Sequence, residues 1–160
     1  MTRPRILAID PGSRTHGVVL ADCSGDLPIP EVVSAAMSHR ETIELIRRAD
    51  RVFVERYAPH EKTGWTSIQT AENVGGLREA ASLLSRPCHL LTRSDWLKLL
   101  RVRYGKGADS RVRRWVVAQH GGDPRSRSRR DLPRALKGIT SHAWQAMGLL
   151  HAGLVSWRGR

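Results

Sequence analysis

Two short apolar runs near the N-terminus, separated by a turn sequence, constrain the fold of this chain more than any other feature. The first run covers Ile6 to Ile9 and leads into Asp10-Pro11-Gly12, and the second covers Gly17 to Ala21. Proline presets a backbone angle that turns need, and glycine accepts conformations that are costly for other residues. Short apolar runs joined in this way are typical of a β-hairpin. The sequence therefore predicts a sheet that begins with two antiparallel strands.

The remainder of the chain alternates between short strand-like runs and segments with apolar residues at helical spacing. Further strands are predicted for Glu31 to Met37, Arg51 to Glu55 and Cys88 to Leu91. Helices are predicted for His39 to Ala49, Thr66 to Leu84, Asp95 to about Val102 with Ser94 as its N-cap, Ala108 to His120, and Ser141 to Trp157. Three antiparallel strands followed by strands that alternate with helices indicate an α/β fold, with a mixed five-stranded sheet covered by helices.

A glycine pair, Gly75-Gly76, lies inside the longest predicted helix. Glycine costs ~1 kcal/mol relative to alanine in a helix, so the pair predicts either a break or a close backbone approach. The chain has 160 residues, which is the length of one domain with a core of its own, and no internal repeat divides it. We therefore expect a single domain over residues 1–160.

The charge balance indicates the class of partner. Lys and Arg number 27 against 15 Asp and Glu, which gives a net charge of +12 and an isoelectric point near 11.2. Such an excess favours a nucleic acid, because each phosphate that Lys or Arg neutralises releases condensed counterions. A basic protein without a nucleic-acid role is the alternative, and an anionic membrane surface is a weaker one, since no long amphipathic basic helix is evident.

The sequence predicts no membrane span, no disulfide framework and no zinc site built from cysteines. No apolar run reaches the ~18 to 20 residues that a membrane span needs, and the N-terminal apolar run stops at Asp10, too early for a signal peptide. Cys23 and Cys88 are too few and too far apart for a disulfide framework or a zinc site. These features predict a cytoplasmic protein that makes no contact with a membrane.

Two acidic residues end predicted strands. Asp10 follows the first strand, and Glu55 ends the strand that starts at Arg51. If these strands are neighbours, the two carboxylates meet at one rim of the sheet. Phosphodiester hydrolysis by two metal ions uses such oxygen ligands to hold ions ~3.5 to 4 Å apart. On local grounds Asp10 fits a turn residue equally well, and Glu55 fits a strand-end ion pair.

Four segments resemble, in order, the RuvC-like Holliday junction resolvases. They are Ile9-Asp10-Pro11-Gly12-Ser13-Arg14 with Gly17, then Val54-Glu55-Arg56-Tyr57 followed by Thr66, Asn73 and Gly75-Gly76, then Gly105-Lys106-Gly107-Ala108-Asp109-Ser110-Arg111-Val112, and finally Ser141-His142-Ala143-Trp144-Gln145-Ala146. The similarity extends from about Ile6 to about Leu154, nearly the whole chain. Each motif is short, but four of them in the family's order and spacing form a specific signal.

The resemblance implies an RNase H-like fold with helices on both faces of the sheet. It also implies a homodimer that cuts two strands of a four-way or other branched DNA symmetrically, leaving 5′-phosphates, in DNA recombination and repair. Asp10 and Glu55 match the first two carboxylates of the family, His142 matches a ligand position that members fill with Asp or His, and Lys106 matches a basic residue near the scissile phosphate. The expected cofactors are two Mg²⁺ or Mn²⁺ ions per active site, with no organic cofactor.

Gln145 departs from this pattern, because the family has Asp at the corresponding position. His142 and Gln145 are three residues apart on a predicted helix, so both can face one site. Three interpretations stay open: Gln145 is a neutral metal ligand, another acid such as Asp131 or Asp109 substitutes for it, or the enzyme is weak. The last interpretation leads to an alternative function, a branched-DNA-binding protein with weak or lost nuclease activity.

Basic tracts and a few exposed polar or aromatic residues are the predicted DNA contacts. The basic residues assigned to phosphate binding are Arg101, Arg103, Arg111, Arg114, Arg127, Arg129, Arg130 and Lys137. Trp65 and Tyr57 are candidates for stacking on an unpaired base at the junction, with core packing as the alternative for each. Asn73 lies in the segment that resembles the junction-contacting helix of the family.

Overall fold

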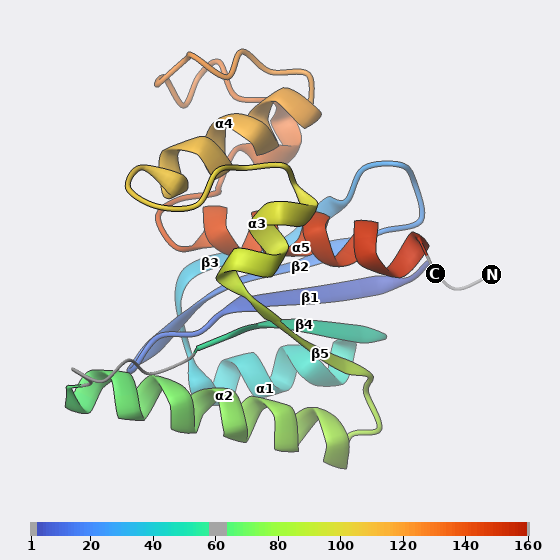
Figure 1. Ribbon diagram of the computed structural model, residues 1–160. Helices are drawn as coiled ribbons and strands as arrows, with labels where there is room; N and C mark the ends of the chain where they lie inside the picture. The colour runs from blue at the N-terminus through green and yellow to red at the C-terminus, as the bar shows by residue number, and fades with distance from the viewer. Residues whose placement is uncertain (1–2, 58–63, 160) are drawn as a thin grey trace.

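The computed structural model describes residues 3–57 and 64–159. Its five-stranded sheet has the order β3-β2-β1-β4-β5. The strands are β1 (Arg5–Asp10), β2 (Thr15–Asp22), β3 (Ile29–Ser38), β4 (Arg51–Arg56) and β5 (Cys88–Thr92). β1, β2 and β3 pair in antiparallel fashion, whereas β4 pairs with β1, and β5 with β4, in parallel. The predicted hairpin and the mixed sheet are therefore confirmed (Figure 1).

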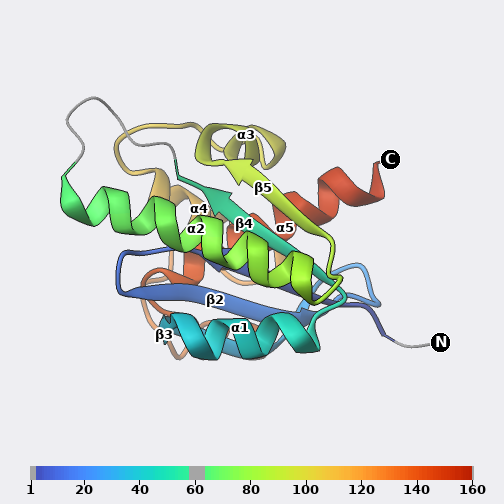
Figure 2. The same ribbon diagram turned by 90° about the horizontal axis from the view of Figure 1, so that it is seen from below.

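Helices cover both faces of this sheet, as predicted. On one face lie α1 (His39–Arg48) and α2 (Trp65–Leu83), side by side in Figure 2. On the other face lie α3 (Arg93–Leu99), α4 (Ala108–Gln119) and α5 (Ala143–Arg158), with the short 3₁₀ helix η1 (Arg134–Leu136) between the last two. Within the described residues, no helix is long and apolar enough to cross a membrane.

The alternation of side chains along β1 explains why both faces are covered. Ile6 and Ala8 belong to the core under α3, α4 and α5, whereas Leu7 and Ile9 belong to the core under α1 and α2. All four side chains are completely buried, because successive residues of a strand point to opposite faces of the sheet. A central strand that is apolar on both sides needs a helical layer on each side.

One of the two outcomes expected for the glycine pair is confirmed, whereas the predicted start of α3 was wrong. The helix predicted from Thr66 continues through Gly75-Gly76 without a break, and the second expectation for the pair, a close approach, holds for Gly76. A Cβ atom on Gly76 would lie 3.3 Å from His39 Nε2, so the missing side chain lets α2 come close to α1. The helix predicted to start at Asp95 begins at Arg93 instead, because the side chain of Thr92, not that of Ser94, accepts the hydrogen bond from the Asp95 amide.

Candidate active site

Asp10 and Glu55 meet at one rim of the sheet, as the sequence predicts for neighbouring strands. β1 and β4 are parallel and pair Ile9 with Val54, so the next residues, Asp10 and Glu55, end up side by side. Both side chains are largely buried, with exposed fractions of 12% for Asp10 and 14% for Glu55. Two carboxylates are thus held next to each other by backbone pairing in the centre of the sheet.

The environment of Glu55 disfavours its charged form. Burial raises the pKa of the Glu55 carboxyl to about 7, and the neighbouring charge of Asp10 contributes in the same direction. Arg93 and the indole of Trp96, whose Nε1 donates to Glu55 Oε2 over 2.9 Å, act in the opposite sense. Strongly perturbed carboxyl groups of this kind are common at functional sites, which makes Glu55 a candidate functional residue.

His142 lies directly above Asp10 at the start of α5. Its Nδ1 is 3.0 Å from Asp10 Oδ2, and this hydrogen bond is the main reason why the pKa of His142 is raised. Gly17, the partner of Asp10 across the hairpin, makes the approach possible. A Cβ atom at Gly17 would lie 2.7 Å from backbone atoms of His142, so only glycine leaves room for α5 to begin here.

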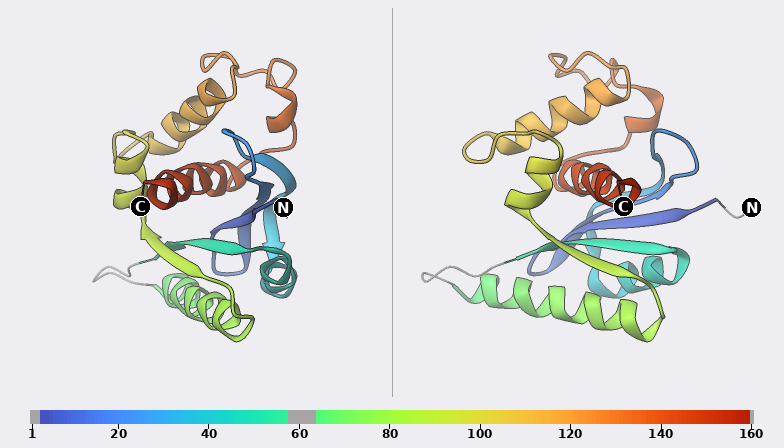
Figure 3. Two further views of the ribbon diagram at one scale, coloured as in Figure 1. Left: turned by 90° about the vertical axis from the view of Figure 1, so that its right-hand side faces the viewer. Right: turned by 45° about the vertical axis from the view of Figure 1, so that its right-hand side comes forward.

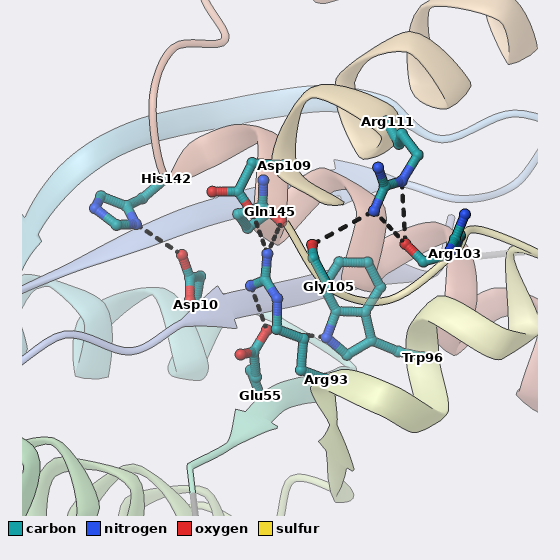
Figure 4. A network of polar contacts seen from close by, with 10 residues as sticks. All are labelled: Asp10, Glu55, Arg93, Trp96, Arg103, Gly105, Asp109, Arg111, His142 and Gln145. Carbon is teal, nitrogen blue, oxygen red and sulfur yellow. Dashed lines mark hydrogen bonds and ion pairs between the residues drawn. The ribbon is translucent and has the colours of Figure 1, made fainter. Parts of the chain in front are cut away.

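Arg93 completes the site and was not among the residues predicted from the sequence. Its guanidinium forms ion pairs with Asp109 and, over 3.6 Å, with Glu55 Oε2. Its Nη2 also donates to Gln145 Oε1 over 3.0 Å (Figure 4). The sequence gives only the position of Arg93 just after a strand, and the register that pairs Arg56 with Thr92 is what brings it near Glu55.

The two acids considered as substitutes for Gln145 occupy different places. Asp109, in the first turn of α4, reaches the site through its ion pair with Arg93. Asp131 lies in the loop after α4, where its carboxylate accepts a hydrogen bond from Ser126 Oγ over 2.7 Å. Gln145 itself is buried, and its side-chain oxygen faces Arg93. Of the two acids, only Asp109 joins the polar network drawn in Figure 4.

Comparison with solved structures places this geometry in a known fold. The structure described as T. thermophilus RuvC in complex with Holliday junction substrate matches with a TM-score of 0.71 and 15% sequence identity, over 97% of this chain and 96% of that chain. The chain has the RuvC fold. A second Thermus thermophilus RuvC structure matches with a TM-score of 0.63 and 16% identity, over the same shares of the two chains. No protein-family model and no curated protein matches the sequence.

The RuvC fold agrees with the RNase H-like architecture that the motifs predicted. The segments that carried the resemblance contribute two neighbouring sets of polar contacts (Figure 4). Asp10 pairs with His142, whereas Glu55, Gln145 and Asp109 all contact Arg93. Lys106 is exposed in the loop that leads into α4, three residues before Asp109. The guanidinium of Arg111 supports this loop by donating to the carbonyl oxygens of Arg103 and Gly105.

The predicted DNA contacts that are not basic lie on α2 and just after β4. Trp65, the first residue of α2, is 68% exposed. Tyr57 is half-buried, and its hydroxyl donates to Ser67 Oγ over 2.8 Å. Asn73 uses its amide to donate to the carbonyl oxygens of Gly12 and Ser13, at 2.9 and 3.1 Å. Asn73 therefore holds the turn that follows Asp10.

The other basic residues are exposed along two segments beside the site. Arg101 and Arg103 lie between α3 and α4, and Arg114 lies on α4. Arg127, Arg129 and Arg130 lie in the loop after α4, and Lys137 follows η1. This loop lies at the end of the molecule opposite α1 and α2 (Figure 3). These basic side chains are exposed to solvent, so they can contact successive phosphates of a DNA strand.

The donor set fits a divalent cation on the side of Asp10. Carboxylate oxygens and an imidazole are ligands of Mg²⁺ and Mn²⁺. A bound cation would offset the repulsion from Asp10, which adds to burial in raising the pKa of Glu55. Over residues 3–57 and 64–159, no three His, Cys, Asp or Glu side chains already converge as a ready-made metal cluster. Asp10 is instead hydrogen-bonded to His142, and Glu55 is hydrogen-bonded to Trp96 and ion-paired with Arg93.

Proposed function

We propose that this chain is a metal-dependent endonuclease that resolves Holliday junctions or other branched DNA. The observation that carries the proposal is the pair Asp10 and Glu55, buried side by side with His142 above them, in a chain with the RuvC fold. The T. thermophilus RuvC structure of the same fold is a complex with Holliday junction substrate. A net charge of +12 adds the affinity for phosphate that such a substrate needs.

In the proposed reaction a water oxygen attacks phosphorus and the bond to the 3′ oxygen breaks, which leaves a 5′-phosphate and a 3′-hydroxyl. Divalent Mg²⁺ or Mn²⁺ supplies a Lewis acid and lowers the pKa of water. Asp10 and Glu55 would hold such an ion from the rim of the sheet, and His142 would add a third donor from the start of α5. Lys106, exposed in the loop before α4, places a positive charge near the scissile phosphate.

We also infer that the active form is a homodimer, because symmetric cutting of two strands needs two equivalent sites. The basic residues of the loops before and after α4 would bind the arms of the junction, and Trp65 would stack at its centre. A protein with this substrate is expected in the cytoplasm, where it meets DNA. The alternative of a junction-binding protein without activity has less support, since both carboxylates and His142 are in place.

One cleavage assay tests the proposal. A four-way junction, a fork and a linear duplex are incubated with Mg²⁺, with Mn²⁺ or with EDTA, and the products are mapped on both strands. We expect paired symmetric nicks in the junction, only with metal. Asp10→Asn should abolish cutting and keep junction binding, because it removes a charged ligand at the rim while the shape of the side chain is retained.

Asp26→Asn is the matched control, because Asp26 is exposed in the β2–β3 loop and belongs to no part of the site. It should cut like the unaltered protein. Binding without any product in either metal would support the alternative of a pure binding protein. Full cutting by Asp10→Asn would refute the assignment of the site.

A further inference from the structure

A guanidinium group occupies one side of the candidate site. Arg93 contacts Asp109, Glu55 Oε2 and Gln145 Oε1, and its side chain is only 29% exposed. Its guanidinium carbon also lies 5.6 Å from the centroid of the Trp96 ring, which donates to the same oxygen of Glu55. Acidic, amide and aromatic groups from β4, α3, α4 and α5 thus hold this one cation (Figure 4).

A metal ion on this side would need the same oxygens. Mg²⁺ binds oxygen ligands at ~2.0 to 2.1 Å and demands near-octahedral geometry. Arg93 Nη2 already lies 3.0 Å from Gln145 Oε1, and Nη1 lies 3.6 Å from Glu55 Oε2, so the guanidinium fills the space between them. A metal ion that bridges Glu55 and Gln145 therefore cannot be present together with the guanidinium of Arg93 in this position.

The neutral side chain of Gln145 fits the same interpretation. The Gln145 oxygen is an acceptor for Arg93, and an amide oxygen is a weak substitute for a carboxylate as a ligand of Mg²⁺. Arg93 cannot lose its charge, so the position carries a permanent positive charge. Because Arg93 supplies this charge, a fourth acidic metal ligand is not needed at position 145. This explains why Gln145 can stand where the family has Asp.

We propose that the active site of this chain takes one divalent ion, and that Arg93 serves as its second cation. The ion would be held by Asp10, Glu55 and His142, on the side of Glu55 opposite Arg93. With these parts, one divalent ion and one guanidinium balance the negative charges of Asp10, Glu55 and Asp109. The proposal rests on the proposed nuclease function, and it replaces the two ions that the family resemblance implies with one.

Metal stoichiometry tests this directly and does not depend on cleavage. The full chain is titrated with Mn²⁺ without DNA, bound ions are counted by calorimetry, and pairs of ions are detected by the spin coupling in electron paramagnetic resonance. We expect one ion per chain, lost in Asp10→Asn. Arg93→Lys keeps a cation and should keep one ion. The double variant Arg93→Gln with Gln145→Asp should bind two ions and show a coupled pair.

Two further variants keep the test decisive. Gln145→Asp alone retains Arg93 and should still bind one ion, which covers the case in which the double variant does not fold. Lys98→Ala removes an exposed charge from the same helix and should leave the count unchanged. Two ions in the unaltered protein or in Gln145→Asp, or a single ion in the folded double variant, would overturn the one-ion proposal. No bound Mn²⁺ at all would overturn the nuclease proposal itself.

Discussion

Glu55 sits in surroundings that oppose its own charge. Its carboxyl is buried beside Asp10 at the end of a parallel strand pair, and the pKa is raised to about 7 from an ordinary value of 4.5. Trp96 and Arg93 both contact its Oε2 and offset part of this cost. A cation bound here would reduce the repulsion between the two carboxylates, and this reduction would favour its binding.

The raised pKa of Glu55 predicts a pH-dependent cost in stability. Between its unfolded value of 4.5 and its folded value of about 7, the folded chain binds more protons than the unfolded chain. The free energy of unfolding contributed by Glu55 therefore falls as the pH rises through this window. In EDTA, Glu55→Gln should be more stable than the unaltered protein by about 3 kcal/mol at about pH 8, and nearly equal to it at about pH 4.5.

Urea unfolding at the two pH values measures this difference. Glu72→Gln changes an exposed carboxylate on α2 and should give the same stability difference at both pH values. A Glu55→Gln variant whose advantage does not grow with pH would show that the carboxyl group is not held in an unfavourable environment.

At the scale of elements, the site depends on the contact between the start of α5 and the hairpin. Gly17 on β2 faces the backbone of His142, and Asp10 pairs with Gly17 across the hairpin. The pairing of β1 with β2 thus fixes both the position of the Asp10 carboxylate and the point at which α5 can begin. Asn73 on α2 holds the turn after Asp10 from the opposite layer. The two helical layers therefore both contribute to the position of one carboxylate.

A methyl group at Gly17 should disturb this contact. In Gly17→Ala the new Cβ would lie 2.7 Å from the backbone of His142, so α5 or β2 must shift, with a loss of about 1 to 3 kcal/mol in the free energy of unfolding. Gly75→Ala is the matched control, because its Cβ meets no atom within 4 Å and lies inside α2. The control should gain about 1 kcal/mol. Urea unfolding of both variants checks the contrast, and equal stabilities would argue against the close approach.

For the whole molecule, charge is distributed over the layers in a way that suits one extended polyanion. The layer of α3, α4 and α5 carries the exposed arginines of the loops around α4. The acids Glu55 and Asp10, at the ends of β4 and β1, contact α3 and the start of α5. Arg48, in the last turn of α1, is an exposed arginine on the opposite face of the sheet. DNA bound across the rim would contact the loops before and after α4 and bring a phosphate to Asp10 and Glu55.

Junction binding in EDTA should depend steeply on salt. If six to eight Lys or Arg residues touch phosphate, the logarithm of affinity falls by about 0.9 per contact for each unit of log salt, a slope of roughly −5 to −7. Arg127→Ala, in the exposed loop, should reduce the slope by about 1. Arg48→Ala should leave it unchanged. A nearly flat dependence, measured by gel shift at several salt concentrations, would remove the basic loops from the binding surface.

Much of the fold follows from local patterns. The apolar runs around Asp10-Pro11-Gly12 predict the hairpin because strands and turns obey short-range rules. The strand at Arg51 and the helices on both sides of it follow from periodicity in the same way. The start of α3 and its N-cap were misjudged because Thr92 and Ser94 are equally good caps by type, and only the end of β5 selects Thr92.

By itself the sequence determined which residues have the chemistry for this site: two strand-end acids, a histidine at a helix start and a basic surface. Tertiary structure alone decided that Arg93 lies between Glu55, Asp109 and Gln145, and that Asn73 holds the turn after Asp10. The physical reason is that these contacts join residues far apart in the chain. They depend on the register of the parallel strands β4 and β5 and on how closely two helical layers approach the sheet, which no local pattern specifies.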